Sequence, residues 1–164
     1  MNSRERVLAT LKRRGVPDHI PFEISWGSFT PLLMKTYRAK TGSDLPPEEY
    51  YDYDTRFVLP GSTRVKTDFS GYFPGLDAGT RFDEWGVGSV PTLYEMPDYK
   101  YHPLENMESV DQVNAFPWPD IGDEYRYAEV AQKTRAYQHR GYAVCGEMYQ
   151  TIFEMAWLMR GMQT

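Results

Sequence analysis

The sequence predicts a mixed α/β fold with a partly parallel sheet and one β-meander insertion. Amphipathic helical segments alternate with short apolar segments along most of the chain. The segment 142–146 is apolar and follows a helical segment, as a buried parallel strand does. Residues 80–85 and 89–95 instead read as paired strands around Gly86-Val87-Gly88, with 99–102 as an optional third strand. Helix–strand alternation interrupted once in this way is typical of α/β proteins.

The N-terminal part of the chain predicts a helix and then a strand. Asn2 and Glu5 have the spacing of a capping box for a helix over 3–14, with Ser3 as an alternative cap and Gly15 as the terminator. The apolar face of this helix consists of Val7, Leu8 and Leu11. The first strand follows, with alternating apolar residues Phe22, Ile24 and Trp26.

Two further helix starts precede the second predicted strand. Thr30-Pro31 begins an amphipathic helix, because proline suits the first helical position. Pro46-Pro47-Glu48-Glu49 begins another, with its acidic pair in the first turn. Residues 56–59 are expected to form the second strand, and residues 61–80 a loop rich in Gly, Ser, Thr and Asp.

The C-terminal half predicts three helices and one strand. Ser109 caps a helix over 109–115, and the rigid connector Pro117-Trp118-Pro119-Asp120 leads to a long helix over 123–140 that Gly141 ends. Its inward residues are expected to be Tyr127, Val130, Ala131 and Thr134. After the strand over 142–146, Thr151 begins a last helix over 151–160 with the apolar residues Ile152, Met155, Ala156 and Met159.

Composition narrows the functional classes. The net charge of -5 argues against a general nucleic-acid binder. The low mean hydropathy of -0.62 and the absence of a long apolar run argue against a membrane span. Cys145 is the only cysteine in the sequence, and no apolar segment of a signal peptide follows the first residues. We therefore expect a cytoplasmic protein that acts on a small molecule.

A set of short motifs, in order along nearly the whole chain, resembles the uroporphyrinogen decarboxylase superfamily. No single motif is specific to this superfamily, but the order and spacing of the whole set are hard to obtain by chance. The motifs are Ser3-Arg4-Glu5-Arg6-Val7-Leu8, Pro17-Asp18-His19-Ile20-Pro21, Phe82-Asp83-Glu84-Trp85-Gly86-Val87, His102-Pro103-Leu104, Pro117-Trp118-Pro119-Asp120, Tyr142-Ala143-Val144-Cys145-Gly146 and Phe153-Glu154 with Leu158-Met159-Arg160-Gly161.

The resemblance implies a (β/α)8 TIM barrel. Such a barrel needs roughly 250 residues, so residues 1–164 are expected to form an incomplete N-terminal barrel domain with an insertion over about 61–102. The superfamily includes the cofactor-free decarboxylase of haem biosynthesis. It also includes zinc-dependent methyltransferases that move methyl groups from corrinoid carriers to thiols.

The chain departs from the decarboxylase pattern at three places. The segment 22–29, where the decarboxylase has an arginine-rich motif for its polycarboxylate substrate, contains no arginine and one acid, Glu23. The catalytic aspartate expected after the second strand has no clear counterpart, because residues 57–59 lead into Pro60-Gly61. Glu154 or Trp157 replaces a tyrosine. These departures favour the methyltransferase-like or functionally unassigned branch over the decarboxylase.

No zinc site is expected within the sequence itself. The resemblance places the methyltransferase ligands, a His-x-Cys pair and a distant Cys, in the second half of the barrel. The chain has His19, His102, His139 and Cys145 but no such pair, and each His is expected to be structural or exposed. Zinc and a corrinoid partner protein are thus expected only for a longer protein.

Barrel enzymes place their chemistry at the carboxyl ends of strands, which selects the candidate residues. Glu23 and Glu147 are the catalytic candidates, as an acid–base pair or as ligands of a cation; alternatively each pairs with an arginine, or Glu147 caps the last helix. The candidates for substrate binding are Trp26, Tyr149, Asp83 and Trp85. Trp85 has the alternative role of packing the insertion onto the barrel.

Three functional hypotheses remain open from the sequence. The first is an enzyme fragment of the superfamily, inactive without the rest of the barrel. The second is a non-catalytic half barrel for binding or assembly, which would form a homo-oligomer through its open strand edge. The third is uroporphyrinogen decarboxylation in porphyrin biosynthesis.

Overall fold

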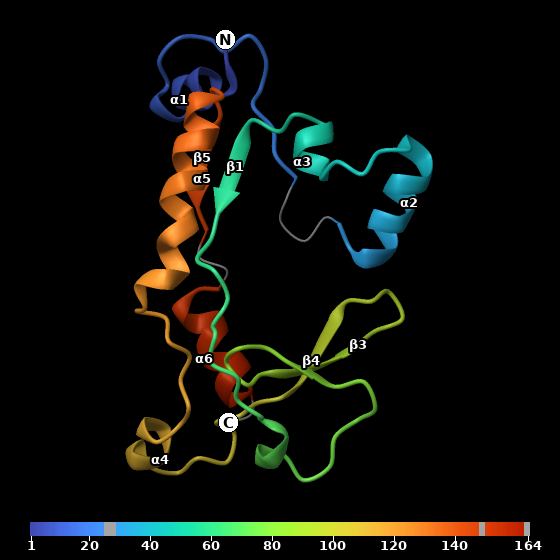
Figure 1. Ribbon diagram of the computed structural model, residues 1–164, viewed down its shortest axis with the longest axis vertical. Helices are drawn as coiled ribbons and strands as arrows, with labels where there is room; N and C mark the ends of the chain where they lie inside the picture. The colour runs from blue at the N-terminus through green and yellow to red at the C-terminus, as the bar shows by residue number, and fades with distance from the viewer. Residues whose placement is uncertain (25–28, 148–149, 163–164) are drawn as a thin grey trace. The chain divides into compact units, whose positions relative to one another are not determined.

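The computed structural model describes residues 1–24, 29–147 and 150–162 (Figure 1). The chain is mixed α/β, with a parallel and an antiparallel sheet in separate compact units. Unit 1 comprises Met1–Gly61 and Tyr127–Glu147, and unit 2 comprises Ser62–Arg126 and Met148–Thr164. The sheets of the described residues have two and three strands, and neither closes into a barrel.

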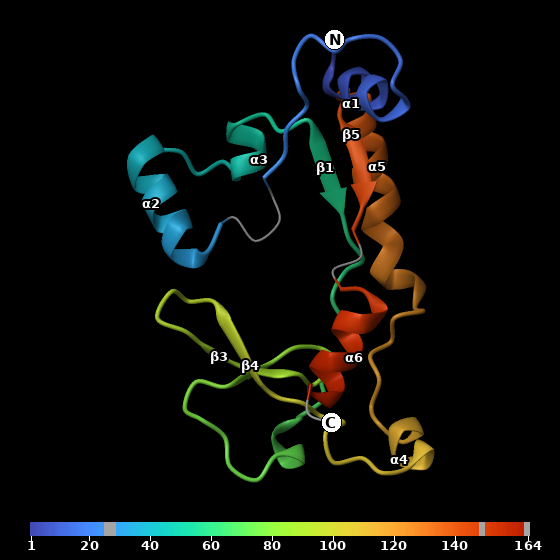
Figure 2. The same cartoon turned by 180° about the vertical axis from the view of Figure 1, so that it is seen from behind.

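Unit 1 is built on two parallel strands. Strand β1 (Thr55–Val58) pairs with β5 (Ala143–Gly146) in register, from Thr55↔Ala143 to Val58↔Gly146. Helix α5 (Ala128–His139), which precedes β5, contacts both strands, as does the N-terminal helix α1 (Ser3–Lys12). Figure 2 shows α5 running alongside the strand pair. Unit 1 therefore contains a β1–α5–β5 crossover, and the 62–126 segment of unit 2 is inserted between β1 and α5.

The predicted capping box of α1 is confirmed, but the predicted end of the helix is wrong. Asn2 accepts from the amide of Glu5, and the Glu5 carboxylate accepts from the amide of Asn2. The helix ends at Arg13 rather than at Gly15, because Arg13 adopts the left-handed conformation (φ 51°) and its amide bonds the carbonyls of the last turn.

The next two helices form where the sequence predicts them. Helix α2 (Pro31–Thr41) begins at the cap Thr30 and ends at Gly42, which has φ 65°. Helix α3 (Pro47–Tyr50) is a single turn. The buried Tyr37 of α2 donates its hydroxyl to the Leu45 carbonyl, and this bond fixes the connection between the two helices.

Two strand predictions for unit 1 need correction. Residues 22–24 are not in a strand: the Asp54 amide donates to the Phe22 carbonyl, but within the described residues this bond does not continue into a ladder; Trp26 lies outside the described residues. The segment 142–146 does form a parallel strand, but it is not buried: Cys145 and Gly146 are exposed. A sheet of two strands presents too little surface for its partners to cover both faces.

Unit 2 contains the predicted β-meander. Strands β2 (Arg81–Phe82), β3 (Gly88–Pro91) and β4 (Pro97–Tyr101) pair antiparallel in the order β2–β3–β4; β2 and β3 are shorter than their predicted segments, whereas β4 begins two residues before the predicted third strand. Gly86 lies in the turn between β2 and β3 with φ 79°, and a Cβ there would come within 2.7 Å of the Phe69 ring. The turn therefore needs glycine for both conformation and space.

The core of unit 2 joins the meander to two helices and a single 3-10 turn, η1 (Ser70–Tyr72). Helix α4 (Val110–Asn114) starts at the predicted cap Ser109, and α6 (Ile152–Arg160) at the predicted Thr151. The buried core residues are Phe69, Val87, Phe116, Leu158 and Met159. Of the apolar residues named for α6, Met159 is buried, whereas Ile152 and Ala156 are exposed, Ile152 by 90%.

The long helix predicted over 123–140 is divided in two. A 3-10 turn, η2 (Glu124–Tyr127), precedes α5. Of the four residues expected to face inward, Val130 and Thr134 are half-buried, whereas Tyr127 and Ala131 are exposed. The change from three to 3.6 residues per turn rotates the faces on either side of Tyr127, which a single helical period cannot represent. Within the described residues, no helix has the length and apolarity needed to cross a membrane.

Candidate functional site

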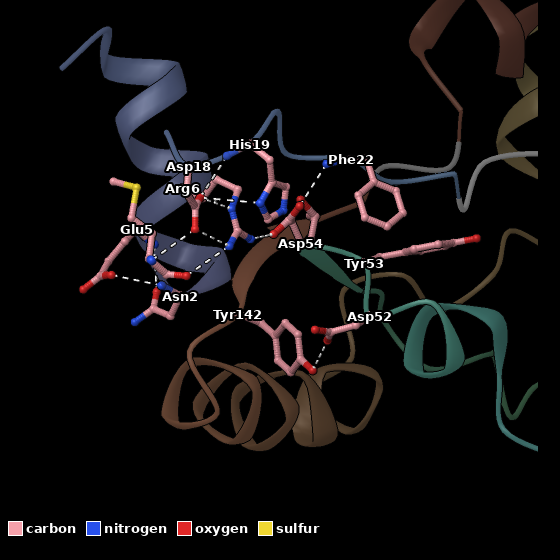
Figure 3. Close-up of polar contacts among 12 residues, drawn as sticks. Asn2, Glu5, Arg6, Asp18, His19, Phe22, Asp52, Tyr53, Asp54 and Tyr142 are labelled. Atoms are coloured by element: carbon pink, nitrogen blue, oxygen red, sulfur yellow. Dashed lines mark hydrogen bonds and ion pairs between the residues drawn. The ribbon is translucent and has the colours of Figure 1, made fainter. Parts of the chain in front are cut away.

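The amino end of the parallel pair is fixed by a buried ion-pair network (Figure 3). Arg6 of α1 donates from Nε to Asp18 Oδ1 over 2.7 Å and from a terminal nitrogen to Asp54, the residue before β1. Asp54 is 1% exposed and also accepts from the amide of Phe22 over 2.9 Å. The Arg6 guanidinium holds the pKa of Asp18 far below its usual value. This network joins α1 and the loop after it to the start of β1.

A second polar network lies at the same end of the strands. Arg56 is 1% exposed, donates to the carbonyls of Tyr53 and Thr55, and places its guanidinium 3.8 Å from the centroid of the Tyr142 ring. Nearby, Arg140 forms a two-bond pair with Glu49 over 2.6 and 3.1 Å, which lowers the pKa of Glu49. Both buried arginines of unit 1 thus face the amino end of β1, the end that serves stability in parallel α/β barrels.

The opposite, carboxyl end of the pair carries Glu147. Its backbone amide donates to the Val58 carbonyl over 3.1 Å, which continues the β1–β5 ladder by one residue. Its side chain is half-buried. Glu147 thus occupies the position where parallel α/β enzymes place functional groups. It does not cap α6, since the capping box there consists of Thr151 and Glu154.

Glu23, the other catalytic candidate, lies near the opposite end of β1. It follows Phe22, which bonds Asp54 just before the strand. Burial is the main cause that raises the pKa of Tyr53, and the charge of Glu23 contributes to it. Val58 lies four positions after Asp54, which is about 13 Å of extended chain. The structure therefore does not bring Glu23 and Glu147 into a shared acid–base pair. Trp26 and Tyr149 lie outside the described residues.

Unit 2 contains a cleft of about 560 Å³ beside the meander. One wall is the loop over 62–69, and the other consists of Phe82, Asp83 and Glu84 at the end of β2, with Pro117 and Pro119 closing one side. Asp83 is exposed and its Oδ1 accepts from the amides of Trp85 and Val87, each over 2.9 Å. Desolvation raises the pKa of the Asp83 carboxyl, although these amide bonds act in the opposite direction.

The start of the loop that lines this cleft is held by Thr63 and Arg64. The Thr63 amide donates to Glu84 over 2.9 Å, and the other Glu84 oxygen accepts from Arg126 over 2.6 Å. The Arg64 amide donates to the Tyr125 hydroxyl over 2.7 Å, and the Arg64 guanidinium lies 4.1 Å from the centroid of that ring. The contacts between Arg64 and Tyr125 therefore join the beginning of the inserted segment 62–126 to its end.

Trp85, expected as a substrate contact or a packing residue, packs against the core of unit 2. It is half-buried against the core cluster and forms an edge-to-face contact with Trp118, with ring centroids 6.4 Å apart. Trp118 belongs to the predicted proline-rich connector, whose Asp120 accepts from Thr63 and Tyr125. Through Asp120 the connector thus binds Thr63, at the start of the cleft loop.

Three functional features were missed from the sequence alone: the two arginine networks and the 62–69 wall of the cleft. Arg6 and Asp54 are 48 positions apart, so no local pattern links them. A signal was available for Arg56, because an arginine within a predicted apolar strand needs a buried partner. For the loop over 62–69, the density of hydroxyl and charged residues was the available signal.

The described residues offer no metal centre, and the comparisons add no relative. Within 1–24, 29–147 and 150–162, no three His, Cys, Asp or Glu side chains are grouped to hold a metal ion. His102 donates from Nδ1 to the Leu158 carbonyl over 2.7 Å, and His19 lies beside Asp18. Comparison of the chain with protein-family models, curated proteins and solved structures finds no match.

Proposed function

We propose that this chain is the N-terminal part of a (β/α)8-barrel enzyme of the uroporphyrinogen decarboxylase superfamily, from the methyltransferase-like or functionally unassigned branch. One observation carries the proposal: β1 and β5 are parallel, in register and joined through α5. This is the repeating unit of a parallel barrel. The family named in this proposal rests on the short sequence motifs.

The neighbourhood of Phe22 also supports a barrel order. The Phe22 carbonyl accepts from the Asp54 amide, so the segment around Phe22 lies beside the start of β1. The segment at Phe22, which is not itself a strand, then β1 and β5 follow one another in the order in which they occur along the chain, as neighbouring elements of a barrel do.

The distribution of arginines favours a substrate other than a polycarboxylate. A porphyrinogen with many carboxylates needs guanidinium groups at the carboxyl ends of the strands. In unit 1 the buried guanidinium groups of Arg6 and Arg56 serve ion pairs and carbonyls at the amino end instead. The functional group at the carboxyl end is the acid Glu147. This arrangement disfavours the decarboxylase alternative.

Zinc does not fit the residues described here. His19, His102, His139 and Cys145 form no donor group, and Cys145 is exposed on β5. In the proposed methyltransferase branch, zinc ligands and the docking site of a corrinoid protein would come from further barrel strands. The role proposed for this chain is to provide the first strands and the carboxylate of Glu147.

Activity assays test the proposal. The longest translated product that contains this sequence is incubated with methylcobalamin and a thiol, and separately with uroporphyrinogen. We expect thiol-dependent loss of the methylcobalamin absorbance and no change in uroporphyrinogen. Glu147→Gln should lower the rate by roughly 10²-fold, whereas Glu129→Gln, a surface change on α5, should not.

Two results would contradict the proposal. Decarboxylation of uroporphyrinogen would restore the decarboxylase alternative. A closed, stable dimer of the chain without turnover of either substrate would favour the assembly module, and ultracentrifugation at several protein concentrations detects it.

A further inference from the structure

We propose that the cleft of unit 2 is a binding site for a small aliphatic primary amine, whose ammonium ion pairs with the carboxylate of Asp83. The proposal is independent of the enzymatic function proposed above, because it rests only on unit 2. A cleft of about 560 Å³ has the size of a small-molecule site, and its walls combine apolar rings with a few polar groups.

The charges of the lining favour a cation over an anion. The charged residues of the cleft are Lys66, Asp68, Asp83 and Glu84. Glu84 is neutralised by Arg126, 2.6 Å away. Two carboxylates then remain against a single ammonium group. A bound anion would have to approach both carboxylates, whereas a bound ammonium ion is attracted by them.

Asp83 is positioned to serve a ligand rather than the fold alone. The amides of Trp85 and Val87 both donate to its Oδ1, and the Gly86 amide also lies at this carboxylate. These two bonds fix the plane of the carboxylate, and Oδ2 keeps acceptor capacity for a ligand. Asp83 is an exposed residue that lines the cleft, so a ligand can reach it. Asp68 also lines the cleft and accepts from the Ser70 amide over 2.9 Å.

The body of the ligand is expected to be aliphatic and short. Phe69, Phe82, Pro117 and Pro119 supply apolar residues to the lining of the cleft. Ser62 and Thr67 also line it. A compact chain with one terminal ammonium group matches this combination of apolar walls and one fixed carboxylate.

Three probes of nearly equal size separate charge from shape: n-butylamine, n-butanol and butanoate. Binding is followed by the amide chemical shifts of Trp85, Gly86 and Val87, which surround the Asp83 carboxyl. We expect butylamine to shift these amides saturably in the millimolar range and to bind more tightly than the other two probes. Equal binding of butylamine and butanol, a preference for butanoate, or no shift with any probe would overturn the proposal.

Variants of opposite expected sign distinguish a site from a folding effect. Asp83→Asn keeps an Oδ1 acceptor for the turn and should weaken butylamine binding roughly tenfold. Lys66→Gln removes a like charge and should strengthen it by roughly two- to threefold. Asp98→Asn makes the same charge change on β4, outside the cleft, and should leave the affinity unchanged. An equal loss in Asp83→Asn and Asp98→Asn would show a nonspecific charge effect and would contradict the assigned site.

Discussion

The amide of Glu147 donates to the carbonyl of Val58, so the residue after β5 is joined to the last residue of β1. This bond keeps the carboxyl ends of the two strands level. The rigid networks of Arg6 and Arg56 lie at the other end of the same strands. Unit 1 therefore has its buried arginine networks at one end of the strands and Glu147, the residue proposed for catalysis, at the other, which is the division expected of a parallel α/β enzyme.

Removal of the Arg6 guanidinium should strongly destabilise unit 1. Arg6→Met keeps most of the apolar stem but leaves the 1% exposed Asp54 without its cation. We expect a loss of about 2–3 kcal/mol in the free energy of unfolding. Urea denaturation followed by circular dichroism measures it. Arg4→Met, on the exposed face of the same helix, is the control and should change stability by less than about 0.5 kcal/mol.

The pair of Asp18 with Arg6 should make stability depend on pH. The folded pKa of Asp18 is depressed, so its contribution is present above the ordinary pKa of aspartate and is lost as the pH falls toward the folded value. Asp18→Asn should therefore be less stable than the parent at pH 7, and the difference should shrink below roughly pH 4. Urea midpoints of both proteins at three pH values test this. A difference that stays constant with pH would rule out the ionic origin.

Gly86 should tolerate no side chain. Gly86→Ala combines a positive φ with a Cβ 2.7 Å from the Phe69 ring, so we expect a loss of about 2–4 kcal/mol. Gly79→Ala has a similar φ but nothing within 4 Å, and should cost only about 1 kcal/mol. The difference between the two melting temperatures isolates the packing contribution. Equal effects would mean that the Phe69 contact is unimportant.

Arg13 offers a stabilising substitution. It ends α1 in the left-handed conformation, which costs less for glycine than for arginine. Arg13→Gly should raise the free energy of unfolding by about 0.5–1 kcal/mol. The neighbouring Arg14 does not have a positive φ, so Arg14→Gly should give no gain. Thermal denaturation of the two variants side by side checks the prediction.

The sequence predicts those elements whose signals are local. Three helix starts, at Asn2, Ser109 and Thr151, are capped by interactions within three residues, and the structure has all three. The parallel pairing of residues 142–146 was predicted, but the exposure of Cys145 depends on what covers the strand. Periodicity describes the residues of a strand, not its neighbours.

The candidate site was less predictable, because its contacts are distant in sequence. The separation of Glu23 from Glu147 follows from the bond between Phe22 and Asp54 and the bond between Glu147 and Val58. The local sequence pattern around these residues predicts neither hydrogen bond. The same holds for the cleft, where Thr63 meets Glu84 and Asp120. The sequence identified Asp83 as a candidate from its place in the meander. The cleft around Asp83 could be recognised only from the three-dimensional structure.

The hydrogen bond and the cation–π contact between Arg64 and Tyr125 have a consequence for folding kinetics. Thr55 and its partner Ala143 are 88 positions apart, so closing that loop in an unfolded chain is slow. Once the inserted segment has folded and its two ends are held together, most of the intervening positions no longer add to the entropy cost of closing this loop. The pairing of β1 with β5 then becomes a nearly local event. Early formation of unit 2 would act as a nucleus for unit 1.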